Sequence, residues 1–329
     1  MSILRDILDE IIDICGQEAG GDFESNMVLP AVQRYDARIR ASIGQNQQRR
    51  AFTLTTVAAT AEYGMPALVR RIIDIEDPTN DRKVTEYTEF EFRREEPGTT
   101  DTGPPERYFP LGTYGVNAQP SAAGTVSAKS NDATDSGSRY VRFAGVDSSG
   151  DYQTERITLS GTTAVDTTTV TTWSKLDTVS TYNDDGSSIT GNITIEDAAD
   201  NTLAVIPPAF RSMEYLWVRF YPIPDSALDL NVRAIASIPP LFNNEDVPRF
   251  DSDYHYLLVE GPASDLLALI GRGQAVGTHL NAFNQGFREF KATQQRRPNL
   301  ELGFANVSNA LGSVDDKARV ISVDGVTVY

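Results

Sequence analysis

The stretch YVRFAGVDSSGDYQTERITLSGTTAV, residues 140–165, decides how the rest of the chain is divided. Apolar and polar residues alternate in both halves of the stretch, which predicts β-strands, and the cluster DSSGD between them is typical of a turn. Similar short segments recur at about ten-residue spacing over residues 119–206. This spacing is typical of the short strands of a β-sandwich. We therefore predict that an all-β insert occupies residues 119–206.

The predicted insert cannot contain a disulfide, because Cys15 is the single cysteine of the chain. Apolar side chains must then hold its sheets together. Its strands are expected at 139–146, 153–159, 165–173, 189–195 and 203–206. Its core is expected from Phe143, Ile157, Leu159, Val170 and Trp173.

The segments on both sides of the insert have a helical period. In residues 3–15, apolar side chains recur every three or four positions and acidic residues lie between them, which predicts an amphipathic helix with Cys15 buried on its apolar side. A second helix is expected from about Asn26. Two more helices are expected at 254–271 and 274–296. The buried stripe predicted for the last of these consists of His279, Leu280, Phe283, Phe287 and Phe290.

Shorter alternating segments predict a small antiparallel sheet beside these helices. Residues 83–95 fit either a helix or a strand, and we favour a short helix. The strands are expected at 52–57, 67–75, 107–114, 214–221 and 228–234. Because 107–114 and 214–221 must still pair or lie side by side, the two ends of the insert should emerge close together.

The expected fold is therefore α+β, with a discontinuous core and an insertion. A helical-bundle adaptor core with a small antiparallel sheet is assigned to residues 1–118 and 207–297. An immunoglobulin-like β-sandwich at 119–206 interrupts this core.

The C-terminal segment, residues 298–329, loses the helical period at Pro298 and is predicted to be an extended arm. Its last ten residues, VISVDGVTVY, are too apolar for a solvated tail. They can dock on a partner by adding a strand to its surface, or they can fold back onto the sheet of their own subunit. The candidate docking residues are Val320, Ile321, Val323, Val326, Val328 and Tyr329.

The charge of the chain argues against a surface built to grip nucleic acid. The net charge is −17, and the insert alone has twelve acidic against five basic residues. Tight phosphate binding needs clustered Lys and Arg. No apolar run reaches the roughly 20 residues that span a bilayer, and the N-terminus lacks the pattern of a signal peptide, so we expect no membrane contact and assembly in a cytoplasm.

Residues that could carry chemistry are few, and each has a simpler structural interpretation. His255 and His279 are expected to be structural histidines, and the acidic pairs at 184–185 and 315–316 to be turn residues. Four strand aromatics could form a sugar-binding platform, although core positions are more common for such residues. These aromatics are Tyr108, Trp217, Phe220 and Tyr221. We predict no enzyme activity and no catalytic, cofactor or metal site.

Three stretches carry a resemblance to a known family: GPPERYF at 103–109, the segment from Leu216 to Leu267, and FREF at 287–290. The long segment contains, in order, a Pro-x-Pro-Asp turn, a Pro-Pro, an acidic loop, a Val-Pro and a Glu-Gly within a helix. In this order the pattern resembles the head-to-tail adaptor (connector) proteins of tailed bacteriophages. The insert looks like the immunoglobulin-like modules that phage structural proteins often carry.

The resemblance implies a virion structural protein in the neck, at the head-tail junction. Its subunits would form a homo-oligomeric ring, by resemblance a dodecamer, between the portal protein and the tail or tail-completion proteins. Genomic DNA would pass through the lumen without tight binding, and the C-terminal arm would grip the portal. The alternative is a carbohydrate-recognition or tail-fibre-associated protein that uses the β insert. A hydrolase ranks third, because no base and nucleophile pair is present.

Overall fold

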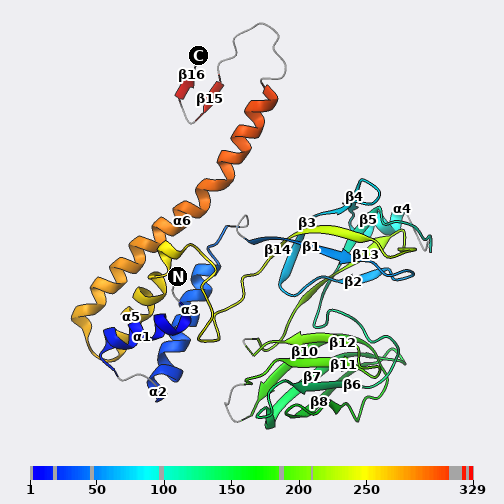
Figure 1. The fold of residues 1–329 in the computed structure, drawn as a ribbon, viewed down its shortest axis with the longest axis horizontal. Coiled ribbons are helices and arrows are strands. Elements are labelled where there is room, and N and C mark those ends of the chain that lie inside the picture. Colours follow the sequence, from blue (N-terminus) through cyan, green and yellow to red (C-terminus); the bar gives the residue numbers. More distant parts are fainter. Residues whose placement is uncertain are drawn as a thin grey trace.

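The computed structural model describes residues 3–17, 21–44, 48–95, 100–184, 189–208, 210–310, 321–323 and 326–328. In Figure 1 these residues form three parts: a group of helices, a seven-stranded sheet, and a second β region below that sheet. We call them the helical part, the main sheet and the β insert.

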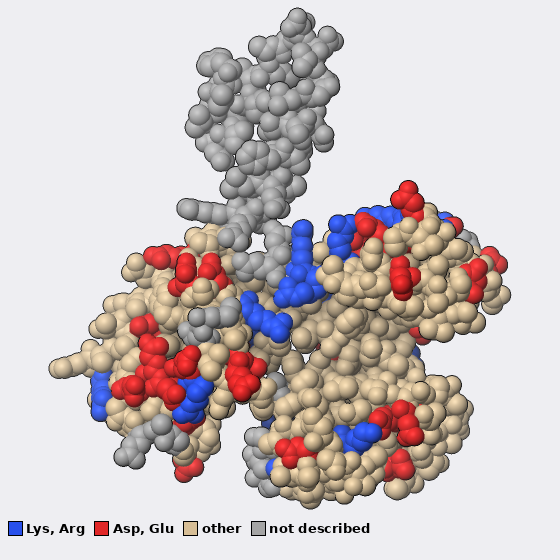
Figure 2. Space-filling view, in the orientation of Figure 1, with Lys and Arg blue, Asp and Glu red and all other residues tan. Residues whose placement is uncertain are grey.

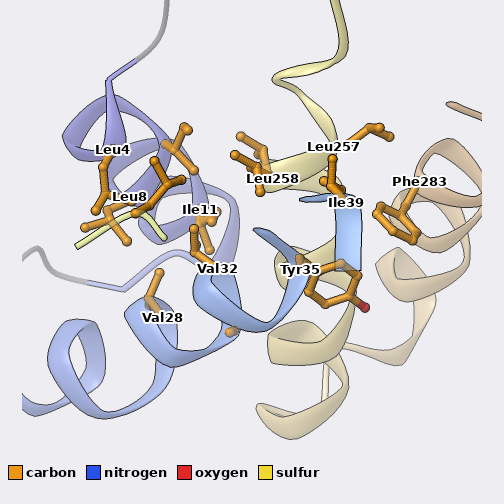
Figure 3. Packing of buried hydrophobic residues seen from close by; sticks show 14 of the residues in the cluster. Leu4, Leu8, Ile11, Val28, Val32, Tyr35, Ile39, Leu257, Leu258 and Phe283 are labelled. Carbon is orange, nitrogen blue, oxygen red and sulfur yellow. The ribbon is translucent and has the colours of Figure 1, made fainter. Parts of the chain in front are cut away.

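The helical part brings together segments from both ends of the sequence. Its helices are α1 (Leu4–Cys15), α2 (Gly21–Phe23), α3 (Leu29–Arg40), α5 (Leu257–Leu269) and α6 (Gly273–Ala310), with a π-helical turn (Glu24–Val28) before α3 and a 3₁₀ turn (Ser252–Tyr254) before α5. The apolar stripe predicted for residues 3–15 is confirmed, and Cys15 is fully buried. Figure 3 shows Leu4, Leu8 and Ile11 of α1 facing the other helices. The second helical run begins at Gly21, earlier than expected.

The stripe predicted for the last helix is confirmed at its three phenylalanines and wrong at Leu280. Phe283, Phe287 and Phe290 are buried, whereas Leu280 is 40% exposed. The prediction that the helical period ends at Pro298 and an extended arm begins there is wrong for residues 298–310, because the helix continues to Ala310. The apolar residues 300, 304 and 307 keep the helical spacing in the sequence, which favours continuation despite the proline.

The main sheet has the strand order β1-β14-β3-β4-β5-β13-β2, in which only the β4 and β5 pair is parallel. Its strands are β1 (Arg49–Thr55), β2 (Glu62–Gly64), β3 (Val69–Asp77), β4 (Arg82–Glu86), β5 (Arg107–Tyr114), β13 (Tyr215–Tyr221) and β14 (Asp229–Ala236). One face encloses an apolar core that includes Met65, Ile75 and Phe220. The ambiguous segment 83–95 divides into β4 and a short helix, α4 (Glu89–Glu95).

The expected fold class, a helical-bundle core with a small sheet, is wrong. The described residues are mostly β: fourteen strands lie in sheets of seven, three and four, and the helices pack as a separate group. No helical-bundle core is evident among the described residues. The error arises because the apolar period of a helix can be recognised within about a dozen consecutive residues. The main sheet, in contrast, is assembled from short strands far apart in the sequence.

The β insert consists of two sheets that share one apolar core. The first has the order β10-β7-β8 and the second β12-β11-β6-β9. The strands are β6 (Val126–Ser130), β7 (Ser136–Asp147), β8 (Tyr152–Ser160), β9 (Val165–Asp166), β10 (Trp173–Asn183), β11 (Ile193–Asp197) and β12 (Thr202–Ile206). All five predicted core residues are buried. The strand expected at 165–173 is wrong, because β9 has two residues and β10 only begins at Trp173.

The order of the insert strands bears on the immunoglobulin-like expectation. Constant-type immunoglobulin domains arrange their strands as ABED and CFG. Here the first insert strand, β6, lies between β11 and β9, and the second, β7, lies between β10 and β8. The insert is thus a two-sheet β structure whose order differs from that pattern.

The ends of the insert lie close together, as the sequence predicted. β5 and β13 pair antiparallel, and Tyr114 lies opposite Tyr215. The backbone N–H groups of Asn117 and Ala118 both donate to the carbonyl of Leu203, at 2.8 and 3.1 Å. The chain therefore leaves the main sheet and returns to it at one place.

Candidate functional site

The segment that follows β14, residues 238–251, joins the main sheet to the helices, and we call it the crossover loop. The N–H of Leu4 donates to the carbonyl of Asp246 at 2.8 Å, and the N–H of Arg5 donates to that of Asn244 at 3.0 Å. Two of the first amides of α1, which have no partner within the helix, are thereby satisfied. The Asp246 carboxylate in turn accepts from the N–H groups of Phe242 and Asn243, each at 2.7 Å.

A buried ion pair fixes the other side of this loop to α3. Asp36 is 2% exposed, and Arg40 Nε donates to its carboxylate at 2.7 Å. Arg40 Nη1 also donates to the carbonyl of Ile238 at 3.0 Å, and the N–H of Leu241 donates to Asp36 at 3.4 Å. Burial raises the pKa of Asp36, and the neighbouring Arg40 opposes that rise. The pair specifies where the loop docks on α3.

The glycine of the Glu-Gly pair, Gly261 on α5, lies where other helices approach closely. A Cβ atom at this position would lie 2.3 Å from two ring carbons of Tyr35 and 3.0 Å from Phe283. The rings of Tyr35 and Phe283 meet edge to face, with centroids 4.8 Å apart. Figure 3 shows both rings at the junction of α3, α5 and α6.

An open groove of 1160 Å³ lies where the three parts meet. The crossover loop contributes Phe242 and Phe250, the insert contributes Asn131, and the returning linker contributes Pro208 and Phe210. The groove combines proline and aromatic surface with amide and charged side chains.

The two histidines occupy structural positions. His255 is 4% exposed, and its Nε2 lies 3.1 Å from the carbonyl oxygen of Phe250. His279 Nδ1 lies 2.8 Å from the carboxylate of Glu260 and so links α6 to α5. Within the described ranges, no group of three or more His, Cys, Asp or Glu could hold a metal ion. Asp184 lies near Arg156, whereas residues 185 and 315–316 lie outside the described residues.

The four aromatics considered as a sugar platform do not form one. Tyr108, Trp217, Phe220 and Tyr221 are all at most 8% exposed, and they line the interior of the main sheet and its junction with the insert. Their positions on strands are therefore core positions. Among the described residues, no helix is long and apolar enough to cross a membrane.

The predicted docking residues of the arm lie beyond the long helix. Ile321 and Val323 belong to β15 (Ile321–Val323), and Val326 and Val328 belong to β16 (Val326–Val328); the two strands pair antiparallel. Val320 and Tyr329 lie outside the described residues. In Figure 1, the C-terminal portion of α6 extends away from the other helices and the two sheets, and the hairpin lies beyond its end.

One surface feature escaped the sequence-based interpretation. Arg49, Arg70 and Arg71 are exposed at one end of the main sheet, and Figure 2 shows basic side chains gathered near the centre of the view, between the helical part and the sheet. The signal was present as two Arg-Arg pairs, at 49–50 and 70–71. It was hidden because the pairs are about 20 positions apart and the net charge is strongly negative.

The described part of the chain thus combines docked loops, a projecting helix and buried ionisable groups that serve packing. The model of the SU10 adaptor protein family matches residues 129–303, which is more than half of the chain. The chain belongs to this family. The matched range runs from the first strand of the insert into α6, so it extends over insert and crossover loop alike. The resemblance to phage adaptors is confirmed at this level.

Other comparisons add little. No curated protein matches the chain. One solved structure, the D431N mutant VP2 protein of infectious bursal disease virus in derived T=1 particles, has 10% sequence identity and a TM-score of 0.11. The alignment covers 78% of this chain and 55% of the VP2 chain, so this chain spans about half the length of that relative. A likeness this weak carries no argument about fold or function.

Proposed function

We propose that this protein is a virion structural adaptor that forms a ring between the portal and the tail of a tailed phage, with the genome passing through the lumen. Membership of the adaptor family supports the class. The observation that carries the finer proposal is the projection of α6 and its hairpin. At about 1.5 Å per residue, the 38-residue helix is about 57 Å long. A helix of that length places its tip well away from the three folded parts.

The hairpin at the tip supplies the means of docking. Two paired strands alone are marginally stable in water, because a single hairpin buries little apolar surface. β15 and β16 contain three residues each, and Ile321, Val323, Val326 and Val328 make them apolar in sequence. Docking on the portal would give this hairpin the surface it needs, by strand addition or by burial of its apolar side chains.

The ring proposal also draws on charge. A net charge of −17 suits a conduit that must release DNA, because a wall that bound phosphate tightly would hold the genome back. A twelve-fold ring, a place in the neck and assembly in the host cytoplasm belong to this proposal. The adaptor class also fits a structural role in place of an enzymatic one.

The second candidate, carbohydrate recognition through the insert, keeps one observation in its favour. The rings of Tyr140 and Tyr182 stack 5.3 Å apart on the first insert sheet, and the guanidinium of Arg156 lies 4.2 Å from the Tyr140 centroid. Stacked aromatics beside an arginine can contact sugar rings. However, Arg156 already covers this surface and donates to the Tyr182 hydroxyl at 2.8 Å, which favours a structural cluster.

Deletion of residues 320–329 tests the arm. The purified variant should melt at the temperature of the full chain, because the hairpin lies apart from the three folded parts, and it should lose binding to portal-containing heads. The substitutions Val205→Ser and Tyr152→Ser provide a control, because they remove exposed apolar side chains from the insert. Lowered stability with intact head binding would show that the segment folds back onto its own subunit.

A further inference from the structure

The outer face of the main sheet has an arginine patch whose centre is apolar. Arg49 on β1 lies opposite Ile235 on β14, and Ile235 lies opposite Arg71 on β3. Adjacent strands are about 4.8 Å apart, so the two arginines stand about 10 Å from each other with Ile235 between them. We call these residues, together with Arg70 and Ile73, the arginine patch.

Two irregularities of β3 place the remaining members on this face. The register of β14 against β3 shifts twice, between Arg233 and Ala234 and between Ile235 and Ala236. The shifts leave Ile73 and Arg70 as extra residues of β3, and both are exposed. β-Bulges of this kind re-aim side chains that strict alternation would turn inward. The bulges therefore add a third arginine and a second isoleucine to one surface.

The arginine patch differs from the charged surface next to it. Further along the same strands, Arg233 is paired with Asp74 at 2.7 Å and with Glu76. In the described parts of the chain, no carboxylate lies within ion-pair distance of Arg49, Arg70 or Arg71. An exposed set of three cations around aliphatic side chains has the composition of a protein interface, in which Arg is enriched and the centre is apolar.

The helical part presents the opposite charge. Asp6, Glu10 and Asp13 follow one another at spacings of four and three on α1, and all three are exposed. They therefore form one acidic row along the outer side of the helix, opposite its buried stripe. In Figure 1, α1 and the main sheet lie on opposite sides of the molecule. Two unlike surfaces in this arrangement suit a heterologous contact, which closes into a ring when the rotation permits.

We infer that the arginine patch of one subunit docks on the acidic row of α1 in a second copy of the same chain. This inference rests on the proposed ring and names its contact. A protein partner is favoured over DNA by the apolar centre, because a phosphate backbone offers nothing for Ile73 and Ile235 to bury against. Charge complementarity then sets the register and accelerates the encounter of the copies.

A charge exchange tests the contact with the full chain. One variant carries Arg49→Glu and Arg70→Glu, and the other carries Glu10→Lys and Asp13→Lys. Sedimentation measures self-association at low and high salt, and circular dichroism verifies that each variant is folded. The wild-type chain should associate more weakly as salt rises, and each variant alone should associate at least about tenfold more weakly, because like charges then face each other. An equimolar mixture should recover association, since each variant supplies the partner charge of the other.

The controls separate the remaining outcomes. Arg142→Glu changes an exposed arginine on the insert and should leave association unchanged. Wild-type association by both variants, a mixture that fails to recover, or a wild-type chain that stays monomeric at low salt would each overturn the docking. Retained association with lost binding to a short DNA duplex would assign the patch to nucleic acid. The adaptor role would survive each of these results, because head binding by the arm tests it separately.

Discussion

At the scale of single residues, Gly261 is a position where the helices leave no space for a side chain. A Gly261→Ala substitution should destabilise the protein by about 1–3 kcal/mol, because the new methyl group overlaps the Tyr35 ring and outweighs the helical preference of alanine. Chemical denaturation measures the change. The matched control is Gly277→Ala in α6, where nothing lies within 4 Å of the added Cβ and a gain of about 0.5–1 kcal/mol is expected. Equal gains in both variants would mean that α3 and α5 are not in close contact.

At the scale of elements, buried carboxylates stabilise the turns of the insert. Burial alone would raise the pKa of Asp197, but hydrogen bonds from Asn201 and Ser121 outweigh it and hold this pKa below its usual range. At Asp135, hydrogen bonds donated to the carboxylate by Ser130, Thr190 and Gly191 likewise outweigh the effect of burial, so its pKa is also lowered. Both carboxylates accept from backbone N–H groups of neighbouring loops, so they connect the loops at the two ends of the β6–β11 pairing.

These lowered pKa values predict that the insert loses stability in acid. A group with a depressed folded-state pKa contributes stability above its unfolded pKa, here 3.8, and loses it as the pH falls through the folded value. Amide hydrogen exchange within residues 121–201 should therefore accelerate as the pH falls below about 4, after correction for intrinsic rates. An Asp197→Asn variant should be less stable at pH 7 by about 1–3 kcal/mol and should show a smaller acid effect. The exposed Asp166→Asn is the control; an equal effect there would refute the assignment.

At the scale of the whole molecule, the insert leaves the main sheet and returns to it at one place, so the remainder should fold without it. Replacing residues 119–206 by a short Gly-Ser linker should leave a helical, soluble chain that still binds portal-containing heads. Its melting temperature should fall, because Val116, Met213 and Trp217 pack in the apolar core of the insert and would lose that cover. Circular dichroism and head binding provide the measurements. An unfolded product would refute the division into modules, and lost attachment to host cells with normal head binding would support recognition by the insert.

By itself, the sequence determined the elements whose signal is local. The stripes of α1 and α6, the turn-rich rhythm of the insert and its five core residues could be predicted because each pattern is complete within a few turns or strands. The adaptor pattern of the crossover loop could also be recognised in the sequence, since its prolines and acidic residues follow one another closely. The candidate docking segment was identified from composition alone, and its role stays a prediction.

Only the tertiary structure decided the main sheet and the surfaces that it creates. β1 pairs with β14 although Thr55 and Asp229 are 174 positions apart, and no local pattern specifies such a partner. The same pairing, with two bulges in β3, brings Arg49, Arg70 and Arg71 onto one face. Pairing across that distance depends on the free energy of the whole fold, because the loop-closure cost is recovered only when the complete apolar core is buried. Local patterns of charge and hydrophobic period therefore predicted the separate helices and strands, but they did not predict how the main sheet joins them.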